Sequence, residues 1–300
     1  MSSQEALDVY LFGMVVWSTL HRLAAPYPDP DHYAEIAESA QVPGGETGNG
    51  AIVLAHWGWR TRMDGPWLGT RTAAGVRACC ARYGIDDRGL VDAPDFDGLE
   101  DLVLIDAQSR TVFGRFARYF DGHAQQWSEP DAAAIARARV VAIDPFFGAS
   151  GERAATLCRE AGKPYVTLDC LPDSLLHRHA AATVISAEFR RQHFPAADTA
   201  ELLDAYARQA PGLCIFTAGA QPVHYARGTQ RAAVPAPAIE PRSTLGAGDV
   251  FRAGVVHGLL AGFDDDKTVR FAAAAAACAC LDFPIAEHPP ALTRIHALMQ

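Results

Sequence analysis

The sequence predicts an α/β fold in which a mostly parallel sheet lies between two layers of helices, with a small β-sheet beside it. Short apolar strand segments alternate with helical segments over residues 138–219, a pattern typical of parallel βαβ units. Two long apolar helices are expected over residues 246–282. The chain has 300 residues, enough to bury a sizeable core, and we expect a single domain over residues 1–300.

One strand and two helices are expected in the first 84 residues, each beside a glycine. Residues 8–17, DVYLFGMVVW, form a β-branched and aromatic run that predicts a buried strand, with a turn or close contact at Gly13. The apolar pattern of residues 51–57 follows the Gly44–Gly45 pair and predicts a buried helix. Residues 72–84 predict a second helix, which ends at its last glycine.

An accessory sheet is expected from two stretches of the first half of the chain. Residues 99–120 contain two apolar runs joined by the turn-like DAQS, which predicts a hairpin. Alternating pieces such as HYAEIAES lie between prolines upstream. Together, strands at about 14–43 and 90–120 are expected to form this small sheet.

The composition excludes several classes of function. The net charge is −9 and the lysines and arginines are scattered, so a nucleic-acid partner is not expected. The longest apolar run, FAAAAAACACL, is far shorter than a membrane span, and the N-terminus carries no basic leader, so we expect no membrane association. The seven cysteines show no CxxC pair, which indicates a reducing, cytoplasmic setting. A small-molecule partner is favoured.

Residues 242–254, RSTLGAGDVFRAG, carry the strongest chemical signal. Gly246, Ala247 and Gly248 allow close approach to backbone N–H groups at the start of a helix, a place that binds anions. Asp249 follows in the first turn and is placed to take a proton from an attacking hydroxyl, so the segment suits phosphoryl transfer. The alternative is a plain loop-to-helix junction with Ser243 or Thr244 as the cap.

Two segments resemble signatures of a known family. Residues 243–251, STLGAGDVF, resemble the DTxGAGDxF signature of the ribokinase (PfkB) family of carbohydrate kinases, and residues 44–51, GGETGNGA, resemble its GGxxxNxA signature. They occur in the family's order, about 200 residues apart. The resemblance implies a ribokinase-like three-layer sandwich with a β-sheet lid. It also implies an enzyme that phosphorylates a hydroxyl of a small sugar with ATP and Mg²⁺.

The resemblance assigns roles to the residues of both signatures. Asp249 matches the general base, and Gly246, Ala247 and Gly248 match the anion hole for the phosphoryl group. On the substrate side, the sugar contacts are Gly44, Gly45 and Asn49. For Asn49, the alternative is the N-cap of the following helix.

Weaker matches to family motifs predict the residues that contact ATP and Mg²⁺. Thr217 and Gly219 align with the TxG turn that meets ATP phosphates, and Thr244 belongs to the C-terminal signature; an ordinary strand-ending turn is the alternative for the first two. Glu188 aligns with the NxxE glutamate that organises water around Mg²⁺, although Ile185 replaces the asparagine. The alternative for Glu188 is a solvated helix start.

The chain departs from the family pattern at substrate-facing positions. Ser18 stands where the family usually carries an aspartate that grips sugar hydroxyls, and Ser243 replaces the first aspartate of the signature. Glu46 stands where sugar-phosphate kinases often place a lysine, which favours a neutral sugar or polyol. Arg110, Arg115 and Arg118 in the expected lid hairpin are interpreted as a solvated face, with contact to an anion as the alternative.

Two alternative functions stay open. A nucleoside kinase of the same fold would use the aromatic residues expected in the lid: Phe113, Phe116, Tyr119 and Phe120. A regulatory sugar-binding protein with weakened catalysis would explain the replacements at residues 18, 185 and 243. The resemblance also favours a homodimer formed through the lid, because an uncovered sheet face seeks a partner.

Overall fold

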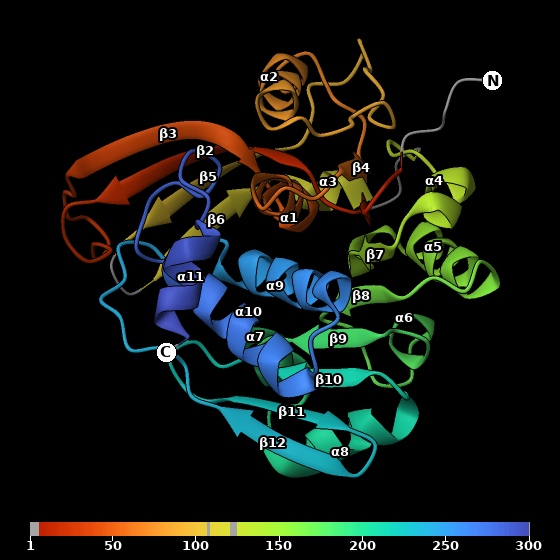
Figure 1. Ribbon diagram of the computed structural model, residues 1–300. Coiled ribbons are helices and arrows are strands. Elements are labelled where there is room, and N and C mark those ends of the chain that lie inside the picture. The colour runs from red at the N-terminus through yellow and green to blue at the C-terminus, as the bar shows by residue number, and fades with distance from the viewer. Residues whose placement is uncertain (1–5, 107–108, 121–124, 300) are drawn as a thin grey trace.

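A mostly parallel sheet of eight strands forms the centre of the computed structural model, which describes residues 6–106, 109–120 and 125–299 (Figure 1). Strands β4, β1, β7, β8, β9 and β10 are parallel neighbours in that order, and β11 and β12 continue the sheet antiparallel. The strands are β1 Val9–Phe12, β4 Thr61–Asp64, β7 Val140–Ile143, β8 Tyr165–Leu168, β9 Ala182–Ile185, β10 Leu213–Phe216, β11 Val223–Arg227 and β12 Gln230–Val234.

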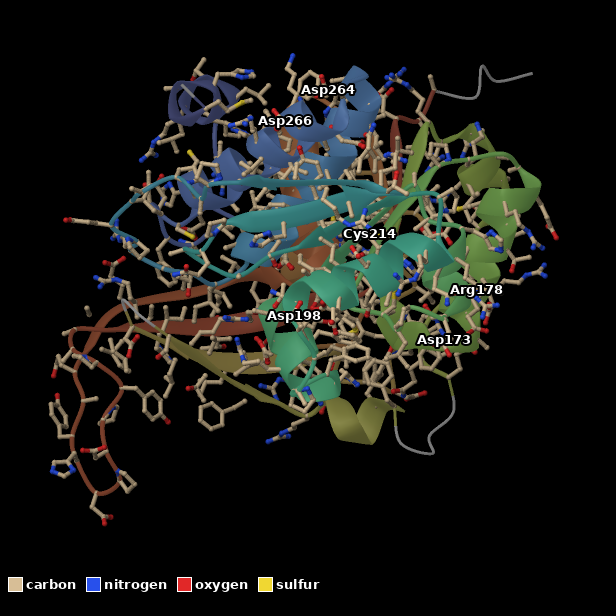
Figure 2. The ribbon with its side chains drawn as sticks, turned by 90° about the horizontal axis from the view of Figure 1, so that it is seen from below. Asp173, Arg178, Asp198, Cys214, Asp264 and Asp266 are labelled. Atoms are coloured by element: carbon tan, nitrogen blue, oxygen red, sulfur yellow. The ribbon has the colours of Figure 1, made fainter. Side chains whose placement is uncertain are left out.

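Helices cover both faces of this sheet, which is why its central strands are buried along their whole length. One face packs on α1 (Glu46–His56), α9 (Ala247–Ala261) and α10 (Asp265–Ala279). The opposite face packs on α4 (Ala132–Arg137), α5 (Ala149–Glu160), α6 (Leu175–Arg178) and α8 (Thr199–Gln209). Figure 2 shows the layers from the side, with Asp266 of α10 and its N-cap Asp264 above the sheet, Cys214 of β10 within it, and Asp198, the N-cap of α8, below.

A second, four-stranded sheet lies beside this sandwich and is called the lid below. It contains β2 (Val16–Leu23), β3 (Ile36–Gly44), β5 (Glu100–Ile105) and β6 (Arg110–Gly114), in the order β3-β2-β5-β6. The β2–β3 hairpin extends away from the central sheet in both views (Figures 1 and 2). The inner face of the lid is buried and carries Leu20, Val42 and Val103. Its outer face exposes Leu102 and Phe113.

Four further helices complete the fold of the described residues. They are α2 (Ala73–Tyr83), α3 (Phe116–Phe120), α7 (Ala187–His193) and α11 (Leu292–Leu298), and a 3₁₀ turn spans Pro145–Phe147. Within the described residues, none of the helices is long and apolar enough to cross a bilayer.

The structure confirms the predicted fold class and both long C-terminal helices. The apolar run over residues 8–17 is divided between β1 and β2. The close contact predicted at Gly13 is confirmed, since a Cβ there would stand 1.9 Å from Oδ2 of Asp144. The hairpin predicted over residues 99–120 is confirmed by the antiparallel pairing of β5 and β6, but its second strand is shorter than predicted. Its turn includes residues 107–108, which lie outside the described residues, and its second strand ends at Gly114.

A short helix replaces the end of that hairpin. Phe116, Tyr119 and Phe120 have the i, i+3, i+4 spacing of one helix face. Their rings pack on the hydrophobic cluster between the sheet and helices α4, α5 and α6, which is called the second core below. Tyr119 is 4% exposed and packs on Phe120 and Trp127. Tertiary packing of these rings therefore overrides the strand propensity of an aromatic segment.

Candidate active site

Helix α9 begins with a turn of small residues. Its N-cap is Gly246, at φ 74°, in the left-handed region that favours glycine. No side chain caps the backbone N–H groups at this end, although the N–H of Ala247 donates a long hydrogen bond of 3.4 Å to the carbonyl oxygen of Thr244. A Cβ at Gly248 would meet no atom within 4 Å, which indicates open space beside the turn. These amides and the positive end of the helix dipole form an arrangement that suits an anion.

Asp249, in the first turn of α9, meets a residue from the other signature. Nδ2 of Asn49 donates a hydrogen bond of 2.7 Å to Oδ2 of Asp249. The two helices supplying them, α1 and α9, pack side by side on the same face of the central sheet. The N-cap of α1 is Gly45, so the alternative of Asn49 as a helix cap is wrong.

The glycine pair before α1 fixes where this helix starts. Gly45 has φ 81°, and a Cβ there would lie 2.6 Å from the carbonyl oxygen of Met14. Thr47 and Gly48 donate their backbone N–H groups to the same carbonyl. Only glycine fits this close approach, and it holds the first turn of α1 against the segment between β1 and β2.

Burial raises the pKa of Asp249 above its ordinary value, while the hydrogen bond from Asn49 and the charge of Arg252 act in the opposite direction. A carboxyl with a raised pKa is a better proton acceptor than an exposed one, because proton affinity increases with pKa. The side chain is partly exposed, so it remains within reach of a ligand. Asp249 therefore has the properties of a general base.

A second acid, Glu46, lies in the first turn of α1. Burial first, and then the nearby charges of Asp249 and Asp144, raise the pKa of Glu46 to about 8. At neutral pH this carboxyl is thus mainly protonated, which limits the negative charge beside Asp249.

A buried ion pair lies beneath these residues, and sequence reasoning missed it. Nη1 of Arg252 pairs with Oδ1 of Asp144, and the two side chains are 2% and 0% exposed. Oδ2 of Asp144 accepts hydrogen bonds from the backbone N–H of Met14 and from the hydroxyl of Thr47. Nη2 of Arg252 donates to the carbonyl oxygen of Glu46 at 2.8 Å. The pair therefore joins α9, β7, α1 and the β1–β2 segment.

Each member of this pair stands out in the sequence, but nothing in the sequence shows that the two residues meet. An arginine within the apolar helix DVFRAGVVHG and an aspartate after the buried run VVAI are both charged residues in apolar surroundings. Such residues are rarely buried unless paired. Their separation of 108 positions made the pairing invisible without coordinates.

Ser18, a residue of the lid, lies close to the start of α1. It lies on β2 and is 5% exposed. A Cβ at Gly44 would stand 2.7 Å from Oγ of Ser18, so the hydroxyl packs directly on this glycine of β3. The structure thus places the predicted substrate residues Ser18, Gly44, Gly45 and Asn49 in one continuous arrangement that leads to Asp249.

Residues 13–286 match the family model of the pfkB family carbohydrate kinases. The chain belongs to this family. As a PfkB-family member it is a kinase, and the family's substrates include sugars and nucleosides according to its relatives. It shares 31% identity with the ribokinase of Bacillus subtilis over 106 residues, which is 35% of each chain. It is 26% identical over 267 residues to a nucleoside kinase of Methanothermobacter thermautotrophicus, covering 83% of this chain and 82% of the relative.

Solved structures share the PfkB-family fold along almost the whole chain. The Arabidopsis thaliana ribokinase complexed with ribose and ATP has a TM-score of 0.79 at 15% identity and covers 99% of both chains. An E. coli structure in complex with ATP and Mg²⁺ has a TM-score of 0.77 at 15% identity, covering 98% of this chain and 99% of the other. At these identities the likeness shows the ribokinase-like fold.

The predicted cofactor residues of this PfkB-family kinase lie at two turns. Thr217 and Gly219 follow β10, and Gly219 has φ 60°, as a tight turn requires. The carbonyl oxygen of Thr217 accepts a hydrogen bond of 2.7 Å from Arg190. Thr244 lies in the loop that enters α9, and its carbonyl oxygen accepts the N–H of Ala247 at 3.4 Å. No described hydrogen bond links Thr217 to Asp249.

Glu188 lies in the first turn of α7, with its side chain 73% exposed. Its Oε2 stands 3.5 Å from Nη2 of Arg110, which comes from β6 of the lid. The described residues include no group of three or more acidic, histidine or cysteine side chains able to hold a metal ion. A single exposed carboxylate fits a Mg²⁺ ion that is held mainly by phosphate and water.

The aromatic residues expected in the lid lie in two different environments. Phe113 is 50% exposed on β6, whereas Tyr119 packs at a tilt against Trp127 and Phe120 at a tilt against Phe147. A hollow of about 520 Å³ opens beside this cluster, but Asp249 does not line it. Arg115 is exposed, and the side chain of Arg118 lies outside the described residues.

Proposed function

We propose that this PfkB-family kinase transfers the γ-phosphoryl group of ATP to a hydroxyl of a small neutral sugar. The observation that carries the proposal is the contact between Asn49 and Asp249, which unites the two signature segments at the uncapped start of α9. This contact supports the proposal because phosphoryl transfer requires a proton acceptor beside a group of anion-binding amides.

In the proposed reaction Asp249 accepts the proton of the substrate hydroxyl as its oxygen attacks the γ-phosphorus. The bond between that phosphorus and the oxygen bridging it to the β-phosphate breaks, and ADP leaves. The hydrogen bond from Asn49 holds Oδ2 of Asp249 in one orientation. The backbone amides of Gly246, Ala247 and Gly248 are proposed to stabilise the negative charge that spreads over the transferring group.

For the nucleotide, we propose contacts with Thr217, Gly219 and Thr244. When bound, Mg²⁺ would neutralise phosphate charge. Glu188 would reach the ion through water, as its exposure allows. The ATP and Mg²⁺ complexes among solved structures of this fold support this choice of cofactors.

For the sugar, we propose a site formed by Ser18, Gly44, Gly45 and Asn49. An amide side chain both donates to and accepts from hydroxyls, and the glycines permit close backbone approach. The carboxylate of Asp249 makes the region unfavourable for a phosphorylated substrate, and Glu46 provides no positive charge to offset it, which supports a neutral sugar or polyol.

A nucleoside kinase is the second candidate, supported by the similarity to the nucleoside kinase of Methanothermobacter thermautotrophicus along most of the chain. Tyr119 does not support it, since this ring is buried in the second core. Because GAGD is retained intact at a helix start, a purely regulatory sugar-binding role is the weaker proposal.

The test measures ADP release from ATP and Mg²⁺ with a panel of D-ribose, D-fructose, D-glucose, glycerol and adenosine. We expect turnover with at least one neutral sugar that exceeds turnover with adenosine. A preference for adenosine would establish the nucleoside alternative. Sugar binding by thermal shift with no ADP release from any compound would support the regulatory role instead.

A further inference from the structure

The lid contains a carboxylate whose position the proposed function leaves unexplained. Asp101 of β5 lies directly opposite Ser18 of β2 in the parallel pairing of these strands. Neighbouring strands are about 4.8 Å apart, and residues in register point to the same face of the sheet. Asp101 is therefore adjacent to the position at which the family usually carries its sugar-gripping aspartate and this chain carries serine.

One oxygen of Asp101 has no partner. Oδ1 is buried and accepts no hydrogen bond from the described residues. The hydroxyl of Ser18 is the hydrogen-bond donor that favours the ionised carboxyl, whereas burial raises the pKa of Asp101. Buried polar atoms in folded proteins are almost always paired, so this carboxylate oxygen requires a hydrogen-bond donor from outside the described residues, such as a ligand hydroxyl or a water molecule.

The face on which Asp101 lies is the one that covers the sandwich. Residues alternate along a strand, so Asp101 shares its face with Val103 and Ile105, which are 1% and 0% exposed. Ser18 shares the face of Leu20 on β2, and its Oγ packs on Gly44. From Gly44 the chain runs through Gly45 into α1, which carries Asn49 and its contact with Asp249.

We propose that Asp101 is the substrate-binding carboxylate of this kinase, supplied by β5 in place of the aspartate absent at position 18. Its free oxygen accepts hydrogen bonds from hydroxyls of a neutral polyol at the end of the molecule remote from Asp249. Ser18 holds the second oxygen and is too short to bind these hydroxyls alone. This inference rests on the proposed function and names Asp101 as the residue that selects its substrate.

The chemistry favours hydroxyl groups over a phosphate or carboxylate. A carboxylate accepts hydrogen bonds from hydroxyls in short, charge-assisted contacts, but it repels an anion. Asp249 adds a second carboxylate that disfavours an anionic substrate. An amino sugar is the other ligand that would satisfy the free oxygen, and the experiment distinguishes it.

The main variant is Asp101→Asn, and the matched control is Glu100→Gln. Glu100 precedes Asp101 on β5, so it points to the opposite face, where Oε2 lies 3.2 Å from Nε of Arg71. Both variants remove one negative charge from the same strand. KM and kcat are measured with the neutral compound of the panel that wild type phosphorylates fastest, together with D-glucosamine.

We expect Asp101→Asn to raise KM for the neutral compound roughly 10- to 100-fold, with kcat changed much less, because hydrogen bonds to a charged group contribute in that range. Glu100→Gln leaves both constants within about twofold. Without ligand, Asp101→Asn raises Tm, since an unpartnered buried carboxylate no longer opposes folding. A purely structural carboxylate would instead lower Tm when replaced.

A transposed variant, Ser18→Asp with Asp101→Ser, provides an independent check. Moving the carboxylate to the neighbouring strand is expected to recover most of the affinity lost in Asp101→Asn. Unchanged KM in Asp101→Asn alongside normal wild-type turnover would overturn this inference and leave the proposed function intact. Preference of wild type for D-glucosamine would overturn the hydroxyl assignment. Absence of wild-type turnover with every compound removes the proposed function, and the inference with it.

Discussion

Asn49 and Asp249 are 200 positions apart in the chain, yet Nδ2 of the first lies 2.7 Å from Oδ2 of the second. The contact requires α1 and α9 to begin at the same level on one face of the sheet. Gly45 and Gly246 set those two starting points, each with a positive φ at the N-cap. The geometry of the candidate base therefore depends on two glycines as much as on the acid itself.

Replacing Asp249 by alanine is expected to lower kcat by about 10²- to 10⁴-fold, the range in which general bases contribute. Binding of ATP, measured by isothermal titration calorimetry, should stay close to that of wild type. Glu201→Ala is the matched control, because Glu201 is an exposed acid in the first turn of α8. Equal losses in both variants would contradict the role of Asp249.

Glu46 makes the stability of the protein depend on pH. Its folded pKa of about 8 exceeds the ordinary value of 4.5, so between these values the folded state binds more protons than the unfolded state. Stability therefore falls as pH rises from about 4.5 to about 8. Glu46→Gln should flatten this decline in urea unfolding measured across that range. An unchanged slope would show that another group titrates.

Arg110 acts on the pKa of Asp249 from the lid. Its positive charge favours the ionised carboxyl and so lowers the pKa, against the larger effect of burial. Arg110→Ala should consequently move the acid limb of the kcat/KM profile to higher pH. Arg115→Ala, a neighbouring exposed arginine, should not move it. If both shift the limb equally, the effect comes from net charge and not from the position of Arg110.

The buried pair of Arg252 and Asp144 predicts a large difference between a single and a double variant. Arg252→Met leaves a buried carboxylate without its cation and should cost about 3–5 kcal/mol of unfolding free energy. Adding Asp144→Asn should restore part of that loss. Arg270→Met removes an exposed pair with Asp266 and should cost less than about 1 kcal/mol. Similar costs for the two single variants would argue against the pair.

The exposed outer face of the lid predicts self-association. Leu102 and Phe113 are paired across β5 and β6 and are 37% and 50% exposed. We expect a dimer through this face, and Leu102→Glu should convert it to a monomer in size-exclusion chromatography with light scattering. Leu171→Glu alters an exposed leucine outside the lid and should leave the dimer intact.

The parts of this molecule that were predictable from sequence are those with local causes. Apolar strands alternating with helices predicted the sandwich, and the small residues around Asp249 predicted an uncapped helix start. The pairing of Asp144 with Arg252 and the register of Asp101 with Ser18 depend on distant segments, so no local pattern contains them. The helix at 116–120 was missed because packing of Tyr119 and Phe120, not propensity, decides its form.

The order of the chain has a consequence for its synthesis. Asn49, Thr47 and Asp144 leave the ribosome well before Arg252 and Asp249, which belong to residues 247–261 of 300. A nascent chain that stops short of α9 contains the residues of all the sheet strands but lacks both Asp249 and the arginine that pairs with Asp144. If Asp249 is the base, as proposed, we expect a chain that ends before α9 to be inactive and less stable than the chain that includes it.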